Sequence, residues 1–491
     1  MAALLFVVPT PSGLGDAAWH TAAIGLWMAI WWMSEALPIA ATSLLPMVAL
    51  PVLGVADIRA ASAPYANPLI FLFLGGFLIA LALEEAGLHR RIALTVLAAV
   101  GRSKRRTVLG FMLASAGLSM WISNTATAMM MLPIALSVVH RAASRDGDDP
   151  AGDDQAGDDQ ASDDQASDDQ SGDGFALCLL LGIAYACSLG GVATLVGTPT
   201  NALLAAFLLE SYDFEISFAA WMGAALPICL IGLALVYLAL TRWLHPLEGG
   251  FDGDAFAAEK AALGAMSPAE RRVGFIFMLT AGLWLTRPLL DNVVAGLSDT
   301  GIALFGALLL FALPVGRGHN ARPVLDWPAT RRLPWGVLLL FGGGLSLASA
   351  IQSTGLAEWL GGGLGRFETA PIVISLLTVT VIVFLTELTS NTATAAAFLP
   401  ILASIALGLG ENPLLLLVPA TIAASCAFML PVATPPNAII YGSGQVSLPS
   451  MAAAGWRLNL IFIVLITLAC QLLLPVVLGV EVGTLPPWAI P

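Results

Sequence analysis

The hexapeptide Ser-Asn-Thr-Ala-Thr-Ala occurs twice in this chain, at residues 123–128 and again at residues 390–395. Both copies interrupt apolar sequence, and each is followed at the same offset by a Leu-Pro pair that ends at Pro133 or Pro400. A duplicated motif at matched places indicates an internal repeat. The chain is therefore predicted to fold as two related halves, each with one polar turn in apolar surroundings.

Two further pairs of segments match between the halves. A glycine-rich apolar segment at residues 74–88 resembles residues 342–356, and GTPTNA at residues 197–202 resembles ATPPNA at residues 433–438. From the serine of the hexapeptide to the asparagine of the second motif there are 78 residues in the first half and 47 in the second. An acidic segment at residues 146–174 accounts for nearly all of the excess, so we interpret it as an insertion.

The inserted segment has low complexity. Residues 146–173 contain twelve Asp and no other charged residue, and they account for nearly all of the net charge of −13. Acidic sequence without aromatic residues cannot bury enough apolar surface to fold. We predict a disordered acidic cytoplasmic loop over residues 146–174.

Apolar runs recur along the rest of the chain, for example at residues 272–290 and 458–478. Charged residues make up only 11% of the 491 positions, whereas a soluble domain carries roughly 25%. Because about 20 apolar residues span a bilayer as a helix, we expect about nine to eleven crossings and some shorter pieces. The predicted fold class is an all-α, multi-pass protein of the cell membrane.

Basic residues predict how the halves lie in the membrane, because short cytoplasmic loops carry the excess of Lys and Arg. They cluster before the first hexapeptide, in the middle connection and before the second glycine-rich segment: Arg90, Arg91, Arg102, Lys104, Arg105, Arg106, Arg242, Lys260, Arg271, Arg272, Arg317, Arg322, Arg331 and Arg332. With the crossings between these clusters, the first hexapeptide enters from the cytoplasm and the second from outside. The two repeats are therefore predicted to be inverted.

Each repeat is predicted to contain a re-entrant hairpin and a broken helix. The apolar arms around each hexapeptide are about 15 residues long, too short to span, and the prolines of the second motif interrupt a helix. The predicted parts are a first repeat at 1–145 with a hairpin at 107–140, the acidic loop at 146–174, a broken helix and the end of the first repeat at 175–245, a cytoplasmic linker at 246–271, and a second repeat at 272–491 with a hairpin at 371–409 and a broken helix at 413–445.

The duplicated motifs contain groups that suit an anion and groups that suit a cation. Helix N-termini after the turns bind anions through free N–H groups, whereas hydroxyl and carbonyl oxygens suit a hard cation such as sodium. No Lys or Arg lies in these motifs, so a bound dianion needs countercharge from bound cations. A single Ser-Asn-Thr usually joins transmembrane helices by hydrogen bonds. Its repetition at matched places, beside a second matched motif, favours a binding site.

The polar residues outside these motifs predict neither a metal site nor a catalytic site, and only Glu387 has more than one possible role. Glu387, close to the second hexapeptide, serves either in proton or cation coupling or as a hydrogen-bonded structural residue, and the sequence leaves both open. The five Cys lie in apolar segments and the five His at segment ends, which does not predict a metal site. A nucleophile–base pair within the spans, which a membrane-embedded enzyme would need, is not found in the sequence.

With these motifs the sequence resembles the divalent anion:sodium symporter family, from about residue 17 to the C-terminus apart from the acidic loop. The resemblance implies an elevator-type carrier, usually a homodimer in the lipid bilayer, that binds sodium ions and a small divalent anion and uses no organic cofactor or nucleic acid. It implies one sodium site at Ser119, Ser123, Asn124 and Gly197, and another at Thr386, Thr389, Asn391 and the Ala433 carbonyl. The implied substrate-binding residues are Asn124, Thr125, Thr198, Pro199, Asn391, Thr392, Thr434 and Pro435.

The function that the resemblance implies is sodium-coupled transport of C4-dicarboxylates such as succinate. Thr200 departs from the family's pattern, in which this loop reads Thr-Pro-Pro-Asn, and this leaves the geometry of the first sodium site open. The residues also leave open citrate or sulfate as cargo, protons in place of sodium, and exchange in place of symport. A sodium- or proton-coupled sulfate permease of the same superfamily is the alternative.

Overall fold

The chain is built almost entirely of helices. The computed structural model describes residues 9–100, 103–146, 165–244, 247, 254–290, 293–316, 322–364 and 370–489. Besides helices and turns, these residues include two short strands, β1 (Pro314–Val315) and β2 (Arg322–Pro323), which pair antiparallel. The predicted all-α architecture is confirmed.

The helices fall into two groups along the chain. The first group is α2 (Asp16–Ser34), α3 (Ile39–Thr42), α4 (Leu45–Val52), α5 (Ile58–Ser62), η1 (Ala63–Ala66), α6 (Pro68–Glu85), α7 (Leu88–Val100), α8 (Lys104–Ser119), α9 (Asn124–Asp146), α10 (Gln165–Val192), α11 (Pro199–Tyr212), α12 (Phe218–Leu238) and η2 (Ala239–Leu244). The second group is α13 (Asp254–Ala262), α14 (Pro268–Leu290), α15 (Asp299–Ala312), η4 (Trp327–Arg332), α16 (Trp335–Ser353), α17 (Leu356–Leu364), α18 (Pro371–Thr386), α19 (Asn391–Gly408), α20 (Leu414–Ala424), η5 (Pro431–Ala433), α21 (Pro435–Gly442), α22 (Leu448–Leu478) and η6 (Pro487–Ala489).

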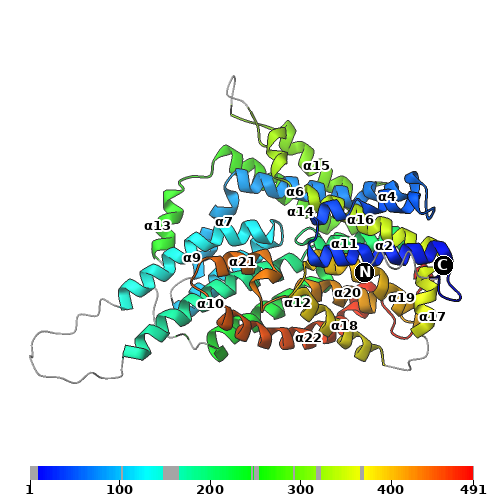
Figure 1. The fold of residues 1–491 in the computed structure, drawn as a ribbon. Helices are drawn as coiled ribbons and strands as arrows, with labels where there is room; N and C mark the ends of the chain where they lie inside the picture. The colour runs from blue at the N-terminus through cyan, green and yellow to red at the C-terminus, as the bar shows by residue number, and fades with distance from the viewer. Residues whose placement is uncertain are drawn as a thin grey trace, which may run out of the picture.

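The order of the helices repeats. The series from α6 to α12 and the series from α16 to α22 each contain a glycine-rich helix, a short helix, two arms of a hairpin, two pieces of an interrupted helix and a final long helix. In each series both hairpin arms pack against the first piece of the interrupted helix, as α9 and α10 do where they lie side by side in Figure 1. The hairpins turn at the duplicated hexapeptides.

The two halves are interlocked through their outer helices, since α15 packs on α6 while α3, α4 and α5 pack on α16. A Cβ atom added at Gly75 of α6 would lie 2.7 Å from the Cβ atom of Ala303, and one added at Gly343 of α16 would lie 2.8 Å from the Cα atom of Ser43. The aligned glycines of the two repeats therefore permit the same close contact, each with the opposite half of the chain.

The first arm of each hairpin is shorter than a membrane span, whereas the second arms, Asn124–Ala142 and Asn391–Gly408, are among the helices long enough to cross. Among the described residues eight helices are long and apolar enough to cross a membrane, fewer than the number of crossings expected from the sequence, and four shorter apolar helices accompany them. α8 and α18 have 16 residues each, which reach about 24 Å at 1.5 Å per residue, short of a hydrocarbon core of about 30 Å. The apolar runs of the sequence thus include arms that turn back.

The acidic insertion begins at the last residue of α9 and extends into the start of α10. Residues 147–164, most of the segment predicted to be disordered, lie outside the described residues. The end of that segment differs from the prediction, because α10 begins at Gln165 rather than after residue 174. Extending an existing helix is easier than nucleating a new one, so the apolar part of α10 continues into the polar residues before it.

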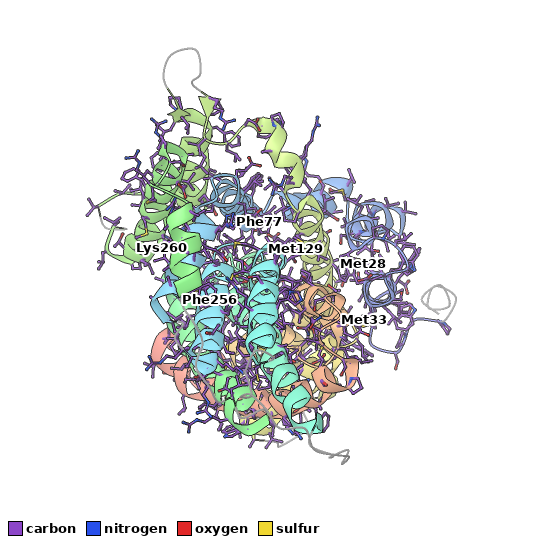
Figure 2. All side chains as sticks on the ribbon, turned by 90° about the vertical axis from the view of Figure 1, so that its left-hand side faces the viewer. Met28, Met33, Phe77, Met129, Phe256 and Lys260 are labelled. Atoms are coloured by element: carbon purple, nitrogen blue, oxygen red, sulfur yellow. The ribbon has the colours of Figure 1, made fainter. Side chains whose placement is uncertain are left out.

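The connection between the repeats is held against the first half. Phe256 of α13 is buried and meets Phe111 of α8 edge-on, with ring centroids 6.0 Å apart. Figure 2 labels Phe256 together with Lys260 on this short helix. Nε of Arg91 in α7 donates to Glu270 at the start of α14 (2.7 Å). The predicted cytoplasmic linker is thus partly helical and anchored to α7 and α8.

Candidate functional site: two hairpin tips and two helix breaks

The first hairpin turns at residues 120–123, the first tip, between the end of α8 and the start of α9. The Ser119 hydroxyl donates to Oδ1 of Asn124 across this turn (2.5 Å). The Ser123 hydroxyl accepts from the backbone N–H of Ala126 (3.2 Å), as a helix N-cap does. Ser119 and Asn124 are therefore brought together, while the Ser123 side chain caps α9.

The second hairpin turns at residues 387–390, the second tip, between α18 and α19. Oγ1 of Thr386 lies 2.7 Å from Oδ1 of Asn391 and 2.9 Å from the carbonyl oxygen of Ala424. One hydroxyl proton serves these three oxygens, so at least one close pair has no hydrogen between its atoms. Thr389 contacts Thr394 instead, with 2.7 Å between their hydroxyl oxygens.

The two interrupted helices have matching breaks, residues 193–198 between α10 and α11 and residues 425–434 between α20 and α21. Nδ2 of Asn201 lies 3.1 Å from the Gly191 carbonyl oxygen and 2.8 Å from that of Thr194. Nδ2 of Asn437 lies 3.1 Å from the carbonyl oxygens at the same two offsets in the second repeat, those of Ala427 and Leu430. Each asparagine amide therefore donates to carbonyl groups that have lost their helical donors, and so holds its break together.

The sequence reasoning did not assign Asn201 and Asn437 a role. The signal was present, because both are the final residue of the matched GTPTN and ATPPN motifs. Their hydrogen-bond partners lie seven and ten residues earlier across an unwound segment, and the path of such a segment does not follow from helical or strand periodicity.

We expect Asn201→Ala to loosen the first break. The variant leaves the carbonyl groups of Gly191 and Thr194 buried without their donor, at about 1 to 3 kcal/mol of stability. The unfolding temperature of the purified protein should fall, and binding at the first tip should weaken by more than binding at the second. Asn437→Ala is the matched comparison and should weaken the second tip instead. Equal effects on both tips from either variant would contradict this assignment.

The first tip rests directly on the first break. A Cβ atom added at Gly191 would lie 2.7 Å from Oδ1 of Asn124 and 3.1 Å from the Gly197 carbonyl oxygen. Glycine at this position therefore allows the Asn124 amide to lie between the hairpin and the break. The structure thus brings together Ser119, Asn124 and Gly197, three of the four residues predicted for the first sodium site.

The predicted substrate residues lie at the starts of four helices. Thr198 and Thr434 have nearly the same extended backbone (φ −142°, ψ 144° and φ −140°, ψ 148°), and both are buried. Pro199 and Pro435 follow them as the first residues of α11 and α21, and Thr125 and Thr392 are the second residues of α9 and α19. With Thr200 in place of a second proline, the backbone at Thr198 is thus nearly the same as at Thr434. Ala433 is buried directly before Thr434.

The Glu387 side chain is hydrogen-bonded to the second break. Its carboxylate accepts from the backbone N–H groups of Phe428 (2.7 Å), Met429 (3.0 Å) and Leu430 (3.0 Å), and from Nδ2 of Asn459 (2.8 Å). It therefore binds the second tip to the second break. In the first repeat the corresponding tie is different, since the Thr194 hydroxyl donates to the Met120 carbonyl (2.5 Å).

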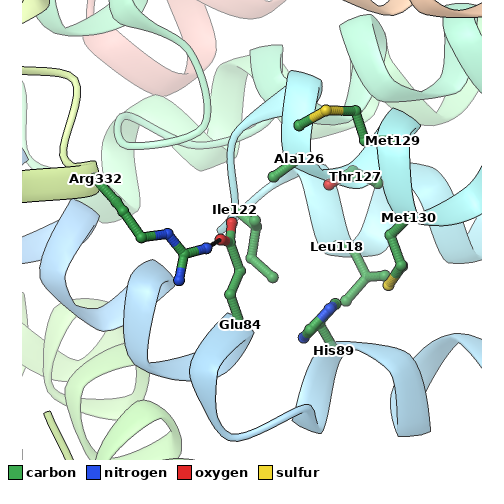
Figure 3. A pocket seen from close by; sticks show the side chains of 9 residues that line it. All are labelled: Glu84, His89, Leu118, Ile122, Ala126, Thr127, Met129, Met130 and Arg332. Atoms are coloured by element: carbon green, nitrogen blue, oxygen red, sulfur yellow. Dashed lines mark hydrogen bonds and ion pairs between the residues drawn. The ribbon is translucent and has the colours of Figure 1, made fainter. Parts of the chain in front are cut away.

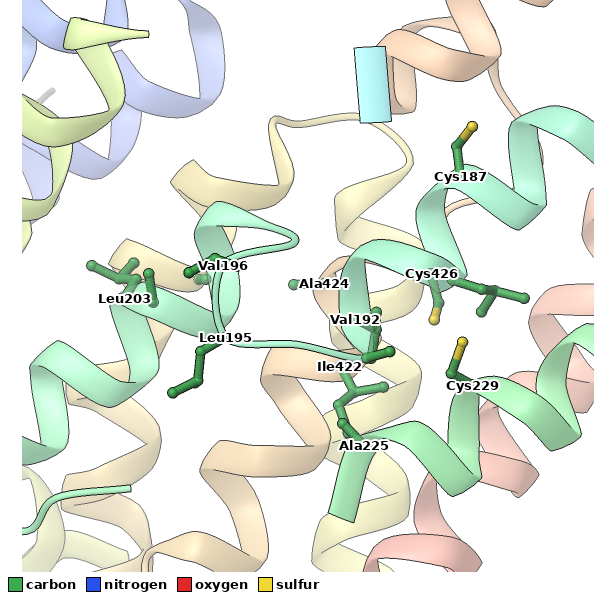
Figure 4. Close-up of a cluster of buried hydrophobic side chains, with 14 of the residues drawn as sticks. Cys187, Val192, Leu195, Val196, Leu203, Ala225, Cys229, Ile422, Ala424 and Cys426 are labelled. Atoms are coloured by element: carbon green, nitrogen blue, oxygen red, sulfur yellow. The ribbon is translucent and has the colours of Figure 1, made fainter. Parts of the chain in front are cut away.

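Apolar side chains surround the breaks. Figure 4 shows Val192, Leu195 and Val196 of the first break region among residues of α12 and α20, with Cys229 and Cys426 directed toward each other. All five cysteines are buried and free. The polar atoms of the breaks are therefore surrounded mainly by apolar side chains. Among the described residues there is no group of His, Cys, Asp and Glu that could hold a metal ion.

A cavity of about 290 Å³ opens beside the first tip (Figure 3). Arg332 forms ion pairs there with Glu84 (3.2 Å) and Glu85 (2.6 Å). Burial lowers the pKa of His89, so its ring is neutral near pH 7. The Thr127 hydroxyl, one turn after Asn124, is buried and has no hydrogen-bond partner among the residues that the structure describes. The lining residues are Glu84, His89, Leu118, Ile122, Ala126, Thr127, Met129, Met130 and Arg332.

Eight candidate membrane helices, together with two polar hairpin tips and two helix breaks, define a multi-pass membrane transporter. The chain belongs to the family described as the sodium:sulfate symporter transmembrane region, which it matches over residues 1–479. The resemblance to divalent anion:sodium symporters is thereby confirmed. The protein is a transporter of the cell membrane and not an enzyme.

Curated relatives are named by their cargo. The chain is 42% identical over 492 residues to the sodium-dependent dicarboxylate transporter SdcS of Staphylococcus saprophyticus, covering 98% of this chain and 91% of the relative. It is also 42% identical to the protein of that name from Staphylococcus aureus strain USA300, covering 95% of this chain and 89% of the relative.

Two solved structures share the fold. One is MtrF of Neisseria gonorrhoeae, described among antimetabolite efflux pumps, with a TM-score of 0.57, 14% identity and coverage of 96% of this chain and 97% of that chain. The other is the YdaH transporter of Alcanivorax borkumensis, with a TM-score of 0.55, 14% identity and coverage of 94% and 98%. At this identity the likeness concerns the architecture alone.

Proposed function

We propose that this protein is a sodium-coupled symporter of C4-dicarboxylates such as succinate. The observation that carries the proposal is the group of oxygens at the second tip, where Thr386, Asn391 and the Ala424 carbonyl share one hydroxyl proton. A small hard cation is the natural partner for close oxygens that lack hydrogens between them. The relatives named as sodium-dependent dicarboxylate transporters support both the ion and the cargo.

The proposed sodium sites use residues of the tips and breaks. Bound sodium supplies the positive charge that these segments lack. The first site would draw on Ser119, Ser123, Asn124 and Gly197, and the second on Thr386, Thr389, Asn391 and the Ala433 carbonyl, to which the structure adds the Ala424 carbonyl beside Thr386. In both sites the Asn side chain accepts from a hydroxyl five residues earlier, so its Oδ1 atom is already directed toward the interior of the turn.

The dicarboxylate would bind between the two tips. Four helices begin there, at Asn124, Pro199, Asn391 and Pro435, and their free N–H groups and dipoles favour negative charge. Asn124, Thr125, Thr198, Pro199 and their counterparts Asn391, Thr392, Thr434 and Pro435 would line the site. Amides and hydroxyls hydrogen-bond carboxylates without neutralising them, so anion binding would depend on the sodium ions.

Transport would follow an elevator mechanism in a homodimer with inverted repeats. Trp121 of the first tip stacks at 6.4 Å on Trp284 of α14 and meets Phe277 edge-on at 4.9 Å. The corresponding residue of the second tip, Leu388, is 70% exposed. A structure in which the first tip is packed on an outer helix and the second tip is uncovered would be one of the two alternating states. The cavity in Figure 3 would lead to the first tip.

The proposal is tested by uptake of radiolabelled succinate into proteoliposomes, with and without an inward sodium gradient and with excess sulfate as competitor. We expect uptake that requires sodium and that sulfate does not inhibit. Vesicles that accumulate labelled sulfate but not succinate would overturn the choice of cargo and favour the sulfate permease. Succinate uptake driven equally well by a proton gradient in sodium-free buffer would overturn the choice of ion.

Deleting residues 146–173 should leave transport within about twofold of the wild type, because the insertion is the part of the first repeat with no counterpart in the second. The measurement is the initial rate of succinate uptake at equal amounts of reconstituted protein. A short Gly-Ser linker would join α9 to the apolar part of α10. A deletion protein that unfolds at the wild-type temperature but does not transport would show that the insertion serves the transport cycle.

A further inference from the structure

A buried hydrogen bond between two hydroxyl groups links the two interrupted helices next to their breaks. Oγ1 of Thr200 and Oγ of Ser425 lie 2.8 Å apart, and the two residues are 0% and 2% exposed. Thr200 is the second residue of α11, directly after the first break, and Ser425 is the first residue of the second break. The bond therefore connects the repeats at the two points where their helices are interrupted.

This bond is not part of the duplicated design. At the position of Thr200 the second repeat has Pro436, and at the position of Ser425 the first repeat has Leu189. The second break closes without a hydroxyl at that position, so a break does not require one. The backbone N–H at the second position of a helix needs no intrahelical acceptor, so proline would fit at residue 200. Thr200 is therefore distinguished by its hydroxyl.

The bond lies between two groups of oxygens, a first cluster at Ser119 and Asn124 and a second cluster at Thr386, Asn391 and the Ala424 carbonyl. On one side, Ser425 is bonded covalently to Ala424, whose carbonyl oxygen is 2.9 Å from Oγ1 of Thr386 in the second cluster. On the other side, Thr200 precedes Asn201, whose amide lies 3.1 Å from the carbonyl oxygen of Gly191. Gly191 in turn supports the Asn124 amide of the first cluster.

We propose that Thr200 and Ser425 form a positioning pair that couples the two sodium sites, an inference that rests on the proposed function. A cation at the second tip draws the Ala424 carbonyl toward it and fixes the direction of the following Ser425. Through the hydroxyl pair this fixes the start of α11 and the first break, which preorganises the oxygens around Asn124. Each sodium ion therefore binds more tightly when the other site is filled.

The coupling is measured by sodium titration of purified protein without any anion, following the unfolding temperature at constant ionic strength with choline as the replacement ion. The same titration is then read as succinate uptake. The variants are Thr200→Val, Ser425→Ala and the double variant, with Thr200→Ser as the conservative change. Thr421→Val is the matched control, because Thr421 is equally buried in α20 and its hydroxyl donates within that helix to the Leu417 carbonyl (2.8 Å).

The wild type and Thr200→Ser should show a Hill coefficient for sodium near 2, whereas Thr200→Val and Ser425→Ala should fall toward about 1 with a rise of about fivefold or more in half-saturating sodium. The double variant should match the single variants, and Thr421→Val should titrate like the wild type. Wild-type cooperativity in Thr200→Val would overturn the inference, as would the same loss in Thr421→Val.

The two readouts keep this inference separate from the proposed function. Sodium-dependent stabilisation that loses cooperativity in Thr200→Val supports the coupling even if the vesicles do not take up succinate, in which case the choice of cargo alone is wrong. A wild-type unfolding temperature that does not respond to sodium would overturn the sodium sites and the coupling together.

Discussion

Asn124→Ala and Asn391→Ala are each expected to reduce sodium-dependent succinate uptake by about 100-fold, the upper end of the effects seen when groups that orient or bind an ion are removed. Each change removes an Oδ1 atom that faces a hydroxyl across its tip, that of Ser119 in the first hairpin and that of Thr386 in the second. It also removes an amide from the start of a helix that faces the proposed anion site. The measurement is the initial uptake rate in proteoliposomes over a range of sodium concentrations.

A buried asparagine with another task provides the control. Asn412 is 4% exposed and its Oδ1 atom accepts from the backbone N–H of Leu414, so it caps the start of α20. Asn412→Ala should lower stability by about 1 kcal/mol, as the loss of a cap does, and leave uptake within about twofold. If Asn124→Ala or Asn391→Ala takes up succinate as fast as Asn412→Ala, the tips are not part of the binding site.

The parts of the fold that could be predicted are those that the duplication repeats. Two hexapeptides in short apolar arms predicted two hairpins, and α8–α9 and α18–α19 turn at those residues. Gly75 and Gly343 aligned between the repeats, but their contacts could not be anticipated, because each meets the opposite half of the chain at Ala303 or Ser43. A local pattern shows that a close approach is needed without showing which helix comes close.

The candidate site likewise has a part that could be predicted from the sequence and a part that could not. Ser119 and Asn124 were expected at the first tip and lie in contact there. The bond between Thr200 and Ser425 could not be predicted, since it joins residues 225 positions apart that are not equivalent in the repeats. A position at which the two repeats differ can be recognised in the sequence. Its role depends on the residue that it contacts in the folded chain, and the sequence does not show that contact.

Glu387 is such a departure, and from the sequence a coupling role and a structural role were both open. Its counterpart in the first repeat is Met120. Its carboxylate accepts hydrogen bonds from three backbone N–H groups of the second break and from the Asn459 amide. Four donors to one buried carboxylate favour the structural role over the coupling role. It replaces the hydrogen bonds that the unwound residues 428–430 would have made in a helix.

We therefore expect Glu387→Ala to destabilise the protein by at least about 3 kcal/mol, because the N–H groups of Phe428, Met429 and Leu430 would remain buried without an acceptor. Glu387→Gln should also be strongly destabilising, since its amide directs hydrogens toward donors. Both should lower the unfolding temperature and abolish uptake. Glu411→Gln is the control, because Glu411 accepts from Gly483 at the surface (2.8 Å) and its replacement should change stability by no more than about 0.5 kcal/mol. A Glu387→Gln protein with wild-type stability whose transport has lost its dependence on pH would instead make this residue the proton carrier.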